Sequence, residues 1–328
     1  MEPTASDGSG PVDFDAATLP WVDRDDFETE LEHRNAAGEL EGEEAEALRQ
    51  FRTRGYVAFP RLLAEDQVDA LVADHDRAWE EGWPVQALVE GRGVVEVSGL
   101  PPRGELGSHH YRLNDIQDVS DAARRAMLDS RIMRFLRAYF AGSPVAMQSL
   151  FFEFGSEQGT HQDFPYVQSQ ILSHLVGCWI ACDDVDADNG PLFYYPGSHR
   201  LPKFDWGDGS LTFDGRDHSQ VERFADYLEH AAEQAGLERL TFHAGRGDVF
   251  LWHGALVHGG SPATDPKKTR RSLVVHYSSR DAYPRDRRFP HADPELYERN
   301  GGYVYLPQAG SRGPLQRLAG RVKRALFG

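Results

Sequence analysis

Cysteine is scarce in this sequence, which has 328 residues and only two cysteines, Cys178 and Cys182. Both lie in one apolar run, 171–182. On an extended strand, four residues at roughly 3.3 Å each would hold their Cα atoms about 13 Å apart, whereas a disulfide needs roughly 7 Å or less. We therefore predict no disulfide between them and expect two small residues buried in the core.

Long apolar runs are missing as well. No stretch reaches the roughly eighteen apolar residues that a transmembrane helix needs. The first residues, Met-Glu-Pro-Thr-Ala-Ser-Asp-Gly, supply neither the basic nor the apolar part of a secretory signal. We expect a cytoplasmic protein without an integral membrane segment.

Basic residues are outnumbered, since 35 Lys and Arg stand against 52 Asp and Glu and the formal net charge is −17. Such a charge opposes binding to nucleic acid and to anionic lipid, so we predict no nucleic-acid partner. An acidic protein also suits high salt, which screens like-charge repulsion. A halophilic source is therefore a hypothesis, and equal folding and activity without added salt would contradict it.

Acidic residues are dense at the start of the chain, and apolar periodicity begins at about residue 46. We predict an acidic, mostly solvated arm over 1–45 with room for one short helical piece, one domain over 46–290 with a helical first part, and an extension over 291–328. The extension ends in a basic amphipathic segment, 315–328. For this segment we favour packing on the acidic body over a weak membrane contact.

From about residue 143, short apolar or alternating runs are separated by turns rich in Gly, Pro, Asn and Asp. Several such strands in one region are typical of a closed or double-sheet β-structure. We therefore predict a mainly β fold with flanking helices and a jelly-roll core. The predicted strands are 145–154, 171–182, 191–195, 239–242, 249–258 and 272–278.

One segment carries side chains of the kind that bind a metal. In Gly159-Thr-His-Gln-Asp-Phe-Pro-Tyr, His161 and Asp163 are two residues apart, so on an extended chain both point to the same face. One more histidine would complete the 2-His-1-carboxylate triad, which suits non-haem Fe(II) and leaves positions open for oxygen chemistry. By itself the pair occurs by chance in many chains.

The third ligand has two candidates downstream, His253 and His258. They are five residues apart, so on one regular strand only one of them can face the metal. His258 precedes Gly259 and Gly260, where the backbone can come close to a ligand. His253 lies between bulky residues, as a hydrogen-bonded core histidine does. We predict His258 as the metal ligand and expect Gly260 to border a bound molecule.

Arg270 begins the next strand-like run. A hairpin after His258 would return it to the metal face, and a guanidinium can bind a carboxylate through two parallel hydrogen bonds. An oxygenase that consumes a keto-dicarboxylic acid needs such a contact. Arg271 is the alternative for this task, and either arginine could instead balance nearby acids.

Taken in order, these residues resemble the phytanoyl-CoA dioxygenase family over about 46–280. The ordered set is far more specific than any one motif. Its parts are the segment from Phe51 to Leu63, His161-Gln-Asp163, Asp188-Asn-Gly-Pro-Leu, Pro196-Gly-Ser-His-Arg, Gly247-Asp-Val, His253 to Gly260, and Arg270.

The resemblance implies a double-stranded β-helix, the cupin-like form of the jelly roll, with Fe(II) as cofactor and 2-oxoglutarate and O2 as co-substrates. It assigns the iron ligands to His161, Asp163 and His258, and the far carboxylate of 2-oxoglutarate to Arg270. Further positions near 2-oxoglutarate are Gln148 or Leu150, Trp179 and Gly260. A basic contact of the phytanoyl-specific enzymes falls on Asp115, and this departure argues against a phytanoyl-CoA substrate.

We therefore predict an Fe(II)- and 2-oxoglutarate-dependent dioxygenase that hydroxylates a C–H bond of a small or medium-sized organic molecule. Asp163 favours hydroxylation over halogenation, because related halogenases lack this carboxylate. The main alternative is a non-catalytic jelly-roll protein that binds a metal or ligand. Metal-dependent hydrolysis is a second alternative, and it gives Arg270 no particular task. The sequence predicts neither the substrate nor the oligomeric state.

Overall fold

A computed structural model describes residues 12–107, 109–289 and 295–307. The basic segment 315–328, for which we predicted packing on the acidic body, lies outside them. No helix within the described residues is long and apolar enough to cross a membrane. The helices are α1 (Phe27–Ala36), α2 (Gly42–Arg54), α3 (Glu65–Glu80), α4 (Asp121–Met127), α5 (Ser130–Phe140) and α6 (Ser219–Gln234).

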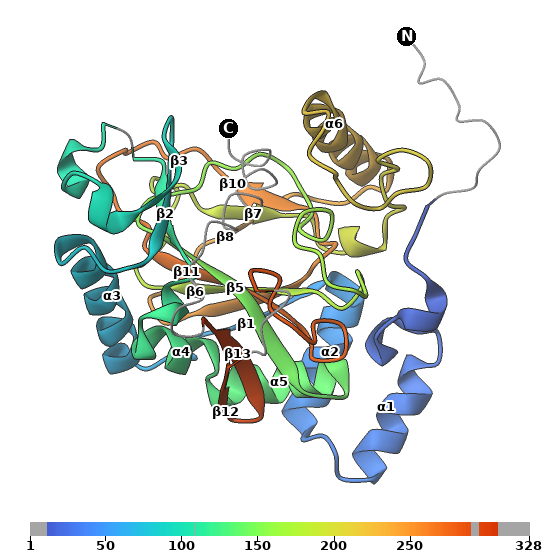
Figure 1. Cartoon of the computed structure of the whole chain (residues 1–328). Coiled ribbons are helices and arrows are strands. Elements are labelled where there is room, and N and C mark those ends of the chain that lie inside the picture. Colours follow the sequence, from blue (N-terminus) through green and yellow to red (C-terminus); the bar gives the residue numbers. More distant parts are fainter. Residues whose placement is uncertain (1–11, 108, 290–294, 308–328) are drawn as a thin grey trace.

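Two mainly antiparallel sheets, with one parallel pairing between β13 and β5, make up the body of the protein (Figure 1). The larger has ten strands, with the order β1-β9-β6-β11-β5-β4-β2-β3 and a hairpin, β12–β13, added to β5. The smaller has the order β10-β7-β8. The strands are β1 (Tyr56–Phe59), β2 (Gln86–Val89), β3 (Gly93–Glu96), β4 (Tyr111–Asn114), β5 (Pro144–Phe152), β6 (Val176–Ala181), β7 (Leu192–Tyr194), β8 (Leu240–Phe242), β9 (Val249–His253), β10 (His258–Gly260), β11 (Ser272–Ser279), β12 (Glu295–Arg299) and β13 (Gly302–Leu306).

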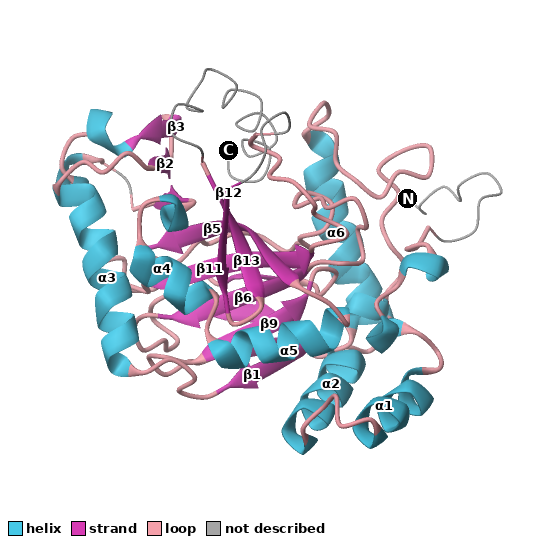
Figure 2. Cartoon of the chain, turned by 60° about the horizontal axis from the view of Figure 1, so that its bottom comes forward, coloured by secondary structure: helices cyan, strands magenta, loops and turns pink. Residues whose placement is uncertain are grey.

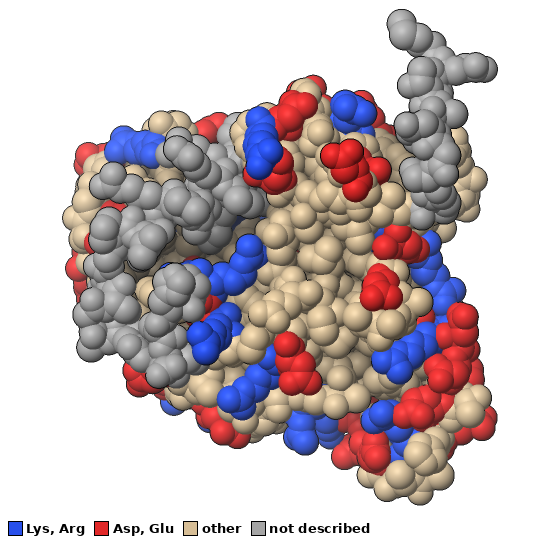
Figure 3. All heavy atoms as spheres, turned by 45° about the vertical axis from the view of Figure 1, so that its right-hand side comes forward, with Lys and Arg blue, Asp and Glu red and all other residues tan. Residues whose placement is uncertain are grey.

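This pair of sheets is the predicted jelly roll, and the fold prediction is confirmed. Helices α2, α3, α4 and α5 cover the outer side of the large sheet, while α6 lies beside the small one (Figures 1 and 2). All six residues of β6 are buried, as expected for a strand that has a neighbour on each side and is covered on both faces. Figure 3 shows acidic and basic side chains interspersed on one face of the molecule.

Both cysteines are free and fully buried, as predicted. Cys178 and Cys182 belong to the large apolar core between the sheet and the helices. Burial raises the pKa of the Cys182 thiol to about 12, so its reactive thiolate form is scarce at neutral pH.

Residues 12–45 differ from the solvated arm that we expected. Trp21, Phe27 and Leu31 are buried in the main core, and the Trp21 indole donates a hydrogen bond to the carbonyl of Ala138 at 2.8 Å. These apolar residues are few and lie among many acids, so composition concealed a helix with one buried side. The domain boundaries at 46 and 290 stay a prediction.

Two further segments differ from the sequence-based expectation. The region 84–120, which we did not assign to strands, contributes β2, β3 and β4. The run 249–258 is not one strand, because β9 ends at His253 and the chain crosses to the small sheet, where β10 starts at His258. The alternation of side chains along one strand therefore cannot decide between His253 and His258, because the two residues belong to different sheets.

Candidate metal centre

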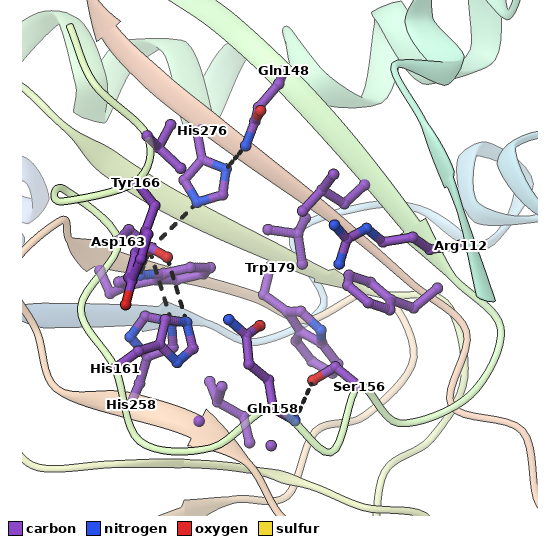
Figure 4. Close-up of a pocket in the computed structure, with 18 of the residues that line it drawn as sticks. Arg112, Gln148, Ser156, Gln158, His161, Asp163, Tyr166, Trp179, His258 and His276 are labelled. Carbon is purple, nitrogen blue, oxygen red and sulfur yellow. Dashed lines mark hydrogen bonds and ion pairs between the residues drawn. The ribbon is translucent and has the colours of Figure 1, made fainter. Parts of the chain in front are cut away.

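Three of the predicted residues converge at one point between the sheets. His161 and Asp163 lie on the loop after β5, and His258 is the first residue of β10. His161 and His258 exchange two backbone hydrogen bonds, of 2.9 and 3.0 Å, which hold the loop against the strand. One donor atom from each of the three residues lies within 4.8 Å of the others (Figure 4).

The two imidazoles are oriented by the backbone. The Nδ1 atom of His161 lies 2.8 Å from the carbonyl of Gly159, and that of His258 lies 2.9 Å from the carbonyl of Leu256. A carbonyl only accepts, so each ring carries its proton on Nδ1 and turns the lone pair of Nε2 inward. The Nε2 atoms lie 3.6 and 3.7 Å from the Asp163 carboxylate oxygens.

Asp163 is held in place from several sides. Its backbone N–H donates to the carbonyl of Gly254 at 3.0 Å, and its Oδ2 accepts a 2.7 Å hydrogen bond from the indole of Trp252. Burial alone would raise the pKa of Asp163, but the electrostatic influence of the neighbouring imidazoles of His258, His276 and His161 holds it well below the usual range. Burial also lowers the pKa of His258 to about 4. At neutral pH the centre therefore offers one carboxylate and neutral imidazole.

This donor set fits Fe(II). Two imidazole nitrogens and one carboxylate form the facial arrangement that leaves positions open for exogenous ligands. All three residues are buried, with exposed fractions between 5% and 8%, and their free lone pairs face one another. An ion at this point would satisfy buried polar atoms that otherwise repel or lack partners.

Arg270 lines the same cavity as the three converging residues. Its Nη1 donates to the carbonyl of Gly190 at 2.7 Å, its Nε has no hydrogen-bond partner, and its guanidinium lies 5.7 Å from the Trp179 ring centroid. Burial lowers its pKa to about 10. A buried guanidinium without a carboxylate partner among the described residues fits an anionic ligand such as 2-oxoglutarate.

Arg271, the alternative, points elsewhere. It forms an ion pair with Asp183 at 2.9 Å and is partly exposed. Its pKa is raised because hydrogen bonds and charge from Asp183 outweigh burial. Arg271 thus balances a nearby acid, and the cavity receives Arg270 alone of the two.

The remaining predicted positions also border this cavity, namely Gln148, Leu150, Trp179 and Gly260. A Cβ on Gly260 would lie only 2.6 Å from Ser156 Oγ, so the backbone there packs closely against its neighbours, and its contact with a bound molecule stays a prediction. The Trp179 indole N–H has no partner. The side chain of Gln148 contacts the imidazole of His276.

Two considered residues lie away from the centre. His253 Nε2 is 3.5 Å from Asp23 Oδ2, and its Nδ1 accepts the backbone N–H of Ala255 at 3.0 Å, which makes it a core histidine. Asp115 lies 3.5 Å from Arg288 and does not line the cavity. The basic residue that does line it from β4 is Arg112, whose pKa is lowered to about 9 by burial.

The sequence analysis missed several residues around the centre. Tyr166, Trp252, Arg112 and His276 all line the cavity. Only Tyr166 had a signal, because it ends the segment that contains His161. The cavity holds about 100 Å³ and adjoins a larger pocket of about 700 Å³, with Arg112, Phe152, Ser156 and Gln158 in both walls.

Two histidines and one carboxylate in this arrangement are the donor set of non-haem Fe(II) oxygenases. Residues 51–272 match the family model described as phytanoyl-CoA dioxygenase (PhyH). The match covers more than half of the chain, which therefore belongs to this family.

Individual relatives are distant. Phytanoyl-CoA dioxygenase domain-containing protein 1 of Mus musculus is 26% identical over 202 residues, which are 56% of this chain and 62% of that protein. The chain thus spans less than two thirds of that relative. The α-ketoglutarate-dependent epimerase SnoN from nogalamycin biosynthesis has a TM-score of 0.54 at 22% identity, covering 81% of this chain and 99% of SnoN. EctD from S. alaskensis with 2-oxoglutarate and 5-hydroxyectoine has a TM-score of 0.53 at 18% identity, covering 84% and 89%. SnoN and EctD share the fold of the present chain.

Proposed function

We propose that this protein is an Fe(II)- and 2-oxoglutarate-dependent dioxygenase that hydroxylates a C–H bond of a small or medium-sized organic molecule. One observation carries the proposal. The convergent donors of His161, Asp163 and His258 open into the same buried cavity as Arg270, a guanidinium without an acidic partner among the described residues. A metal-dependent hydrolase would need the donors but would leave this arginine without a task.

The residues have distinct roles in this proposal. His161, Asp163 and His258 hold the iron, and Arg270 binds the far carboxylate of 2-oxoglutarate. When bound, Fe(II) and 2-oxoglutarate supply the oxidation, in which O2 gives one oxygen atom to the substrate and one to succinate while CO2 is released. Gln148, Leu150, Trp179 and Gly260 border the co-substrate and shape its site.

The protein contributes orientation and exclusion of water. Backbone carbonyls fix both imidazoles before the metal arrives, so binding costs little reorganisation. Leu150 and Trp179 form apolar walls, and charge-assisted contacts to Arg270 are stronger in such surroundings than in water.

The adjoining pocket of about 700 Å³ is the proposed site for the body of the substrate. Its charged and titratable wall residues are Glu90, Arg92, His110, Arg112 and Glu157. Two glutamates stand against two arginines there, and this balance favours a neutral or zwitterionic molecule over the several phosphates of a CoA thioester.

The test is co-substrate turnover. The full-length chain is loaded with Fe(II) without oxygen, given 2-oxoglutarate and exposed to air, and succinate is measured. We expect succinate even without the true substrate, through slow uncoupled turnover. His258→Ala, measured in parallel, should abolish it. Metal binding without any succinate would support the non-catalytic alternative.

A further inference from the structure

A third histidine, His276, stands beside the triad and has no role in the iron site as described so far. It lies on β11, is 3% exposed and lines the cavity. Its Nε2 is 3.4 Å from Asp163 Oδ2 and has no hydrogen bond of full geometry (Figure 4). The three residues whose donor atoms cluster for a metal do not include it.

Strand alternation aims this side chain inward. His276 and Val274 are two residues apart on β11 and both line the cavity, whereas Leu273, Val275 and Tyr277 lie in the apolar core. The register of β11 against β5 shifts only after His276, which is opposite Gln148. His276 therefore faces the cavity as every second residue of a strand does.

Gln148 sets the protonation of the ring. Its amide Nε2 lies 3.1 Å from His276 Nδ1. An amide nitrogen donates and does not accept, so Nδ1 is the acceptor and a neutral ring carries its hydrogen on Nε2. That hydrogen faces Asp163 Oδ2.

The two oxygens of Asp163 are therefore in different surroundings. Oδ2 accepts from the Trp252 indole at 2.7 Å and faces His276 at 3.4 Å. The neighbour of Oδ1 is His161 Nε2 at 3.6 Å, and His258 Nε2 lies 3.7 Å from Oδ2. The Trp252 indole occupies Oδ2 from the sheet side with His276 Nε2 beside it, whereas Oδ1 accepts no side-chain hydrogen bond from the described residues and is left for a metal.

We infer that His276 is a positioning residue that, together with Trp252, engages Oδ2 so that Asp163 binds the metal through Oδ1 alone. This inference rests on the proposed function. An Fe(II) ion held by one oxygen of Asp163 and two imidazoles would keep positions open for 2-oxoglutarate and O2, whereas a carboxylate bound through both oxygens would take one of those positions.

Loss of an iron ligand would abolish metal binding and the reaction with O2 together, whereas loss of the His276 donor should affect only the reaction with O2. Without the His276 donor, the metal and 2-oxoglutarate still bind, but the position for O2 is partly blocked. A hydrogen bond to a charged group is worth about 1.5–3 kcal/mol, and at 3.4 Å the lower end applies. We expect the O2-dependent rate to fall about tenfold.

The experiment compares His276→Leu, which removes the donor, with His276→Gln, whose amide can replace it. Mn(II) affinity and 2-oxoglutarate affinity are measured by calorimetry without oxygen. The coordination number of the Fe(II)–2-oxoglutarate complex is measured by near-infrared magnetic circular dichroism, and 2-oxoglutarate consumption is followed in air. For His276→Leu we expect both affinities within about threefold of wild type, an altered coordination number and the tenfold slower rate. For His276→Gln we expect the wild-type spectrum and most of the rate.

Two outcomes would overturn the inference while leaving the proposed function intact. One is a wild-type spectrum and rate in His276→Leu. The other is loss of Mn(II) binding, which would make His276 a ligand. If His276→Leu does not fold, Gln148→Leu serves instead, because it frees the ring and should slow the rate in the same direction, and an unchanged rate would refute the role. A wild-type protein that binds Mn(II) but never consumes 2-oxoglutarate would instead contradict the proposed function.

Discussion

Replacing Arg270 by methionine should stabilise the metal-free protein and weaken its binding of 2-oxoglutarate, two effects of opposite sign. Burial lowers the pKa of the guanidinium from 12.5 to about 10, with no acid contributing, and this cost of holding the charge corresponds to roughly 3 kcal/mol. Methionine keeps the packing against Trp179 but loses the charge-assisted hydrogen bond to Gly190, worth about 1.5–3 kcal/mol. We expect a net gain of up to about 1.5 kcal/mol in the free energy of unfolding.

The same substitution removes the donors for the far carboxylate of 2-oxoglutarate. Two charge-assisted hydrogen bonds at about 1.5–3 kcal/mol each predict a Kd raised at least about 100-fold. Unfolding by urea of the metal-free protein gives the first quantity, and anaerobic calorimetry on the Mn(II)-loaded protein gives the second. Arg271→Met is the matched control, because it loses an ion pair outside the cavity and should leave the Kd within about twofold. An unchanged Kd for Arg270→Met would refute the reasoning.

Four other substitutions test the centre and the packing of the fold. His258→Ala should abolish Mn(II) binding, whereas His253→Gln should keep it, and calorimetry that gives the reverse would exchange their roles. Gly177→Ala should cost about 1–3 kcal/mol in urea unfolding and weaken Mn(II) binding, because the added Cβ would lie 2.1 Å from the Trp252 ring; unchanged stability would contradict the tight packing. Asp76→Asn should destabilise the protein at neutral pH, since a hydrogen bond from the preceding histidine holds the pKa of Asp76 at about 2. A lowered pKa stabilises the folded state above about pH 4 and ceases to do so as pH falls through about 2, so the difference from wild type in urea midpoint should shrink over that range.

The sequence was informative where the spacing of residues or the order of motifs determines the geometry. His161 and Asp163 share a face because they are two residues apart, and the ordered motifs led to the jelly roll. His258 does meet the other two donors, but the strand parity used to choose it does not apply, because the chain changes sheets after His253. The position of His258 directly before the close-packed Gly259 and Gly260 was the better reason for choosing it.

What the sequence could not predict depends on pairing between distant strands. His276 reaches Asp163 from β11, and Trp252 reaches the carboxylate from β9. Neither contact leaves a local pattern. The strands of the region 84–120 were missed because each has only four residues, too few to establish a period.

Gly177 and Trp252 are opposite each other on β6 and β9, and their fit constrains how this protein can evolve. A larger residue at 177 requires a smaller ring at 252, yet a smaller ring releases the Asp163 carboxylate that Trp252 holds. Each single replacement is therefore harmful on its own, and a compensating pair still loses the hydrogen bond. Substitutions at Gly177 thus affect the Asp163 carboxylate indirectly, through Trp252. Directed evolution of this protein toward new substrates should leave both positions fixed and vary the walls of the larger pocket.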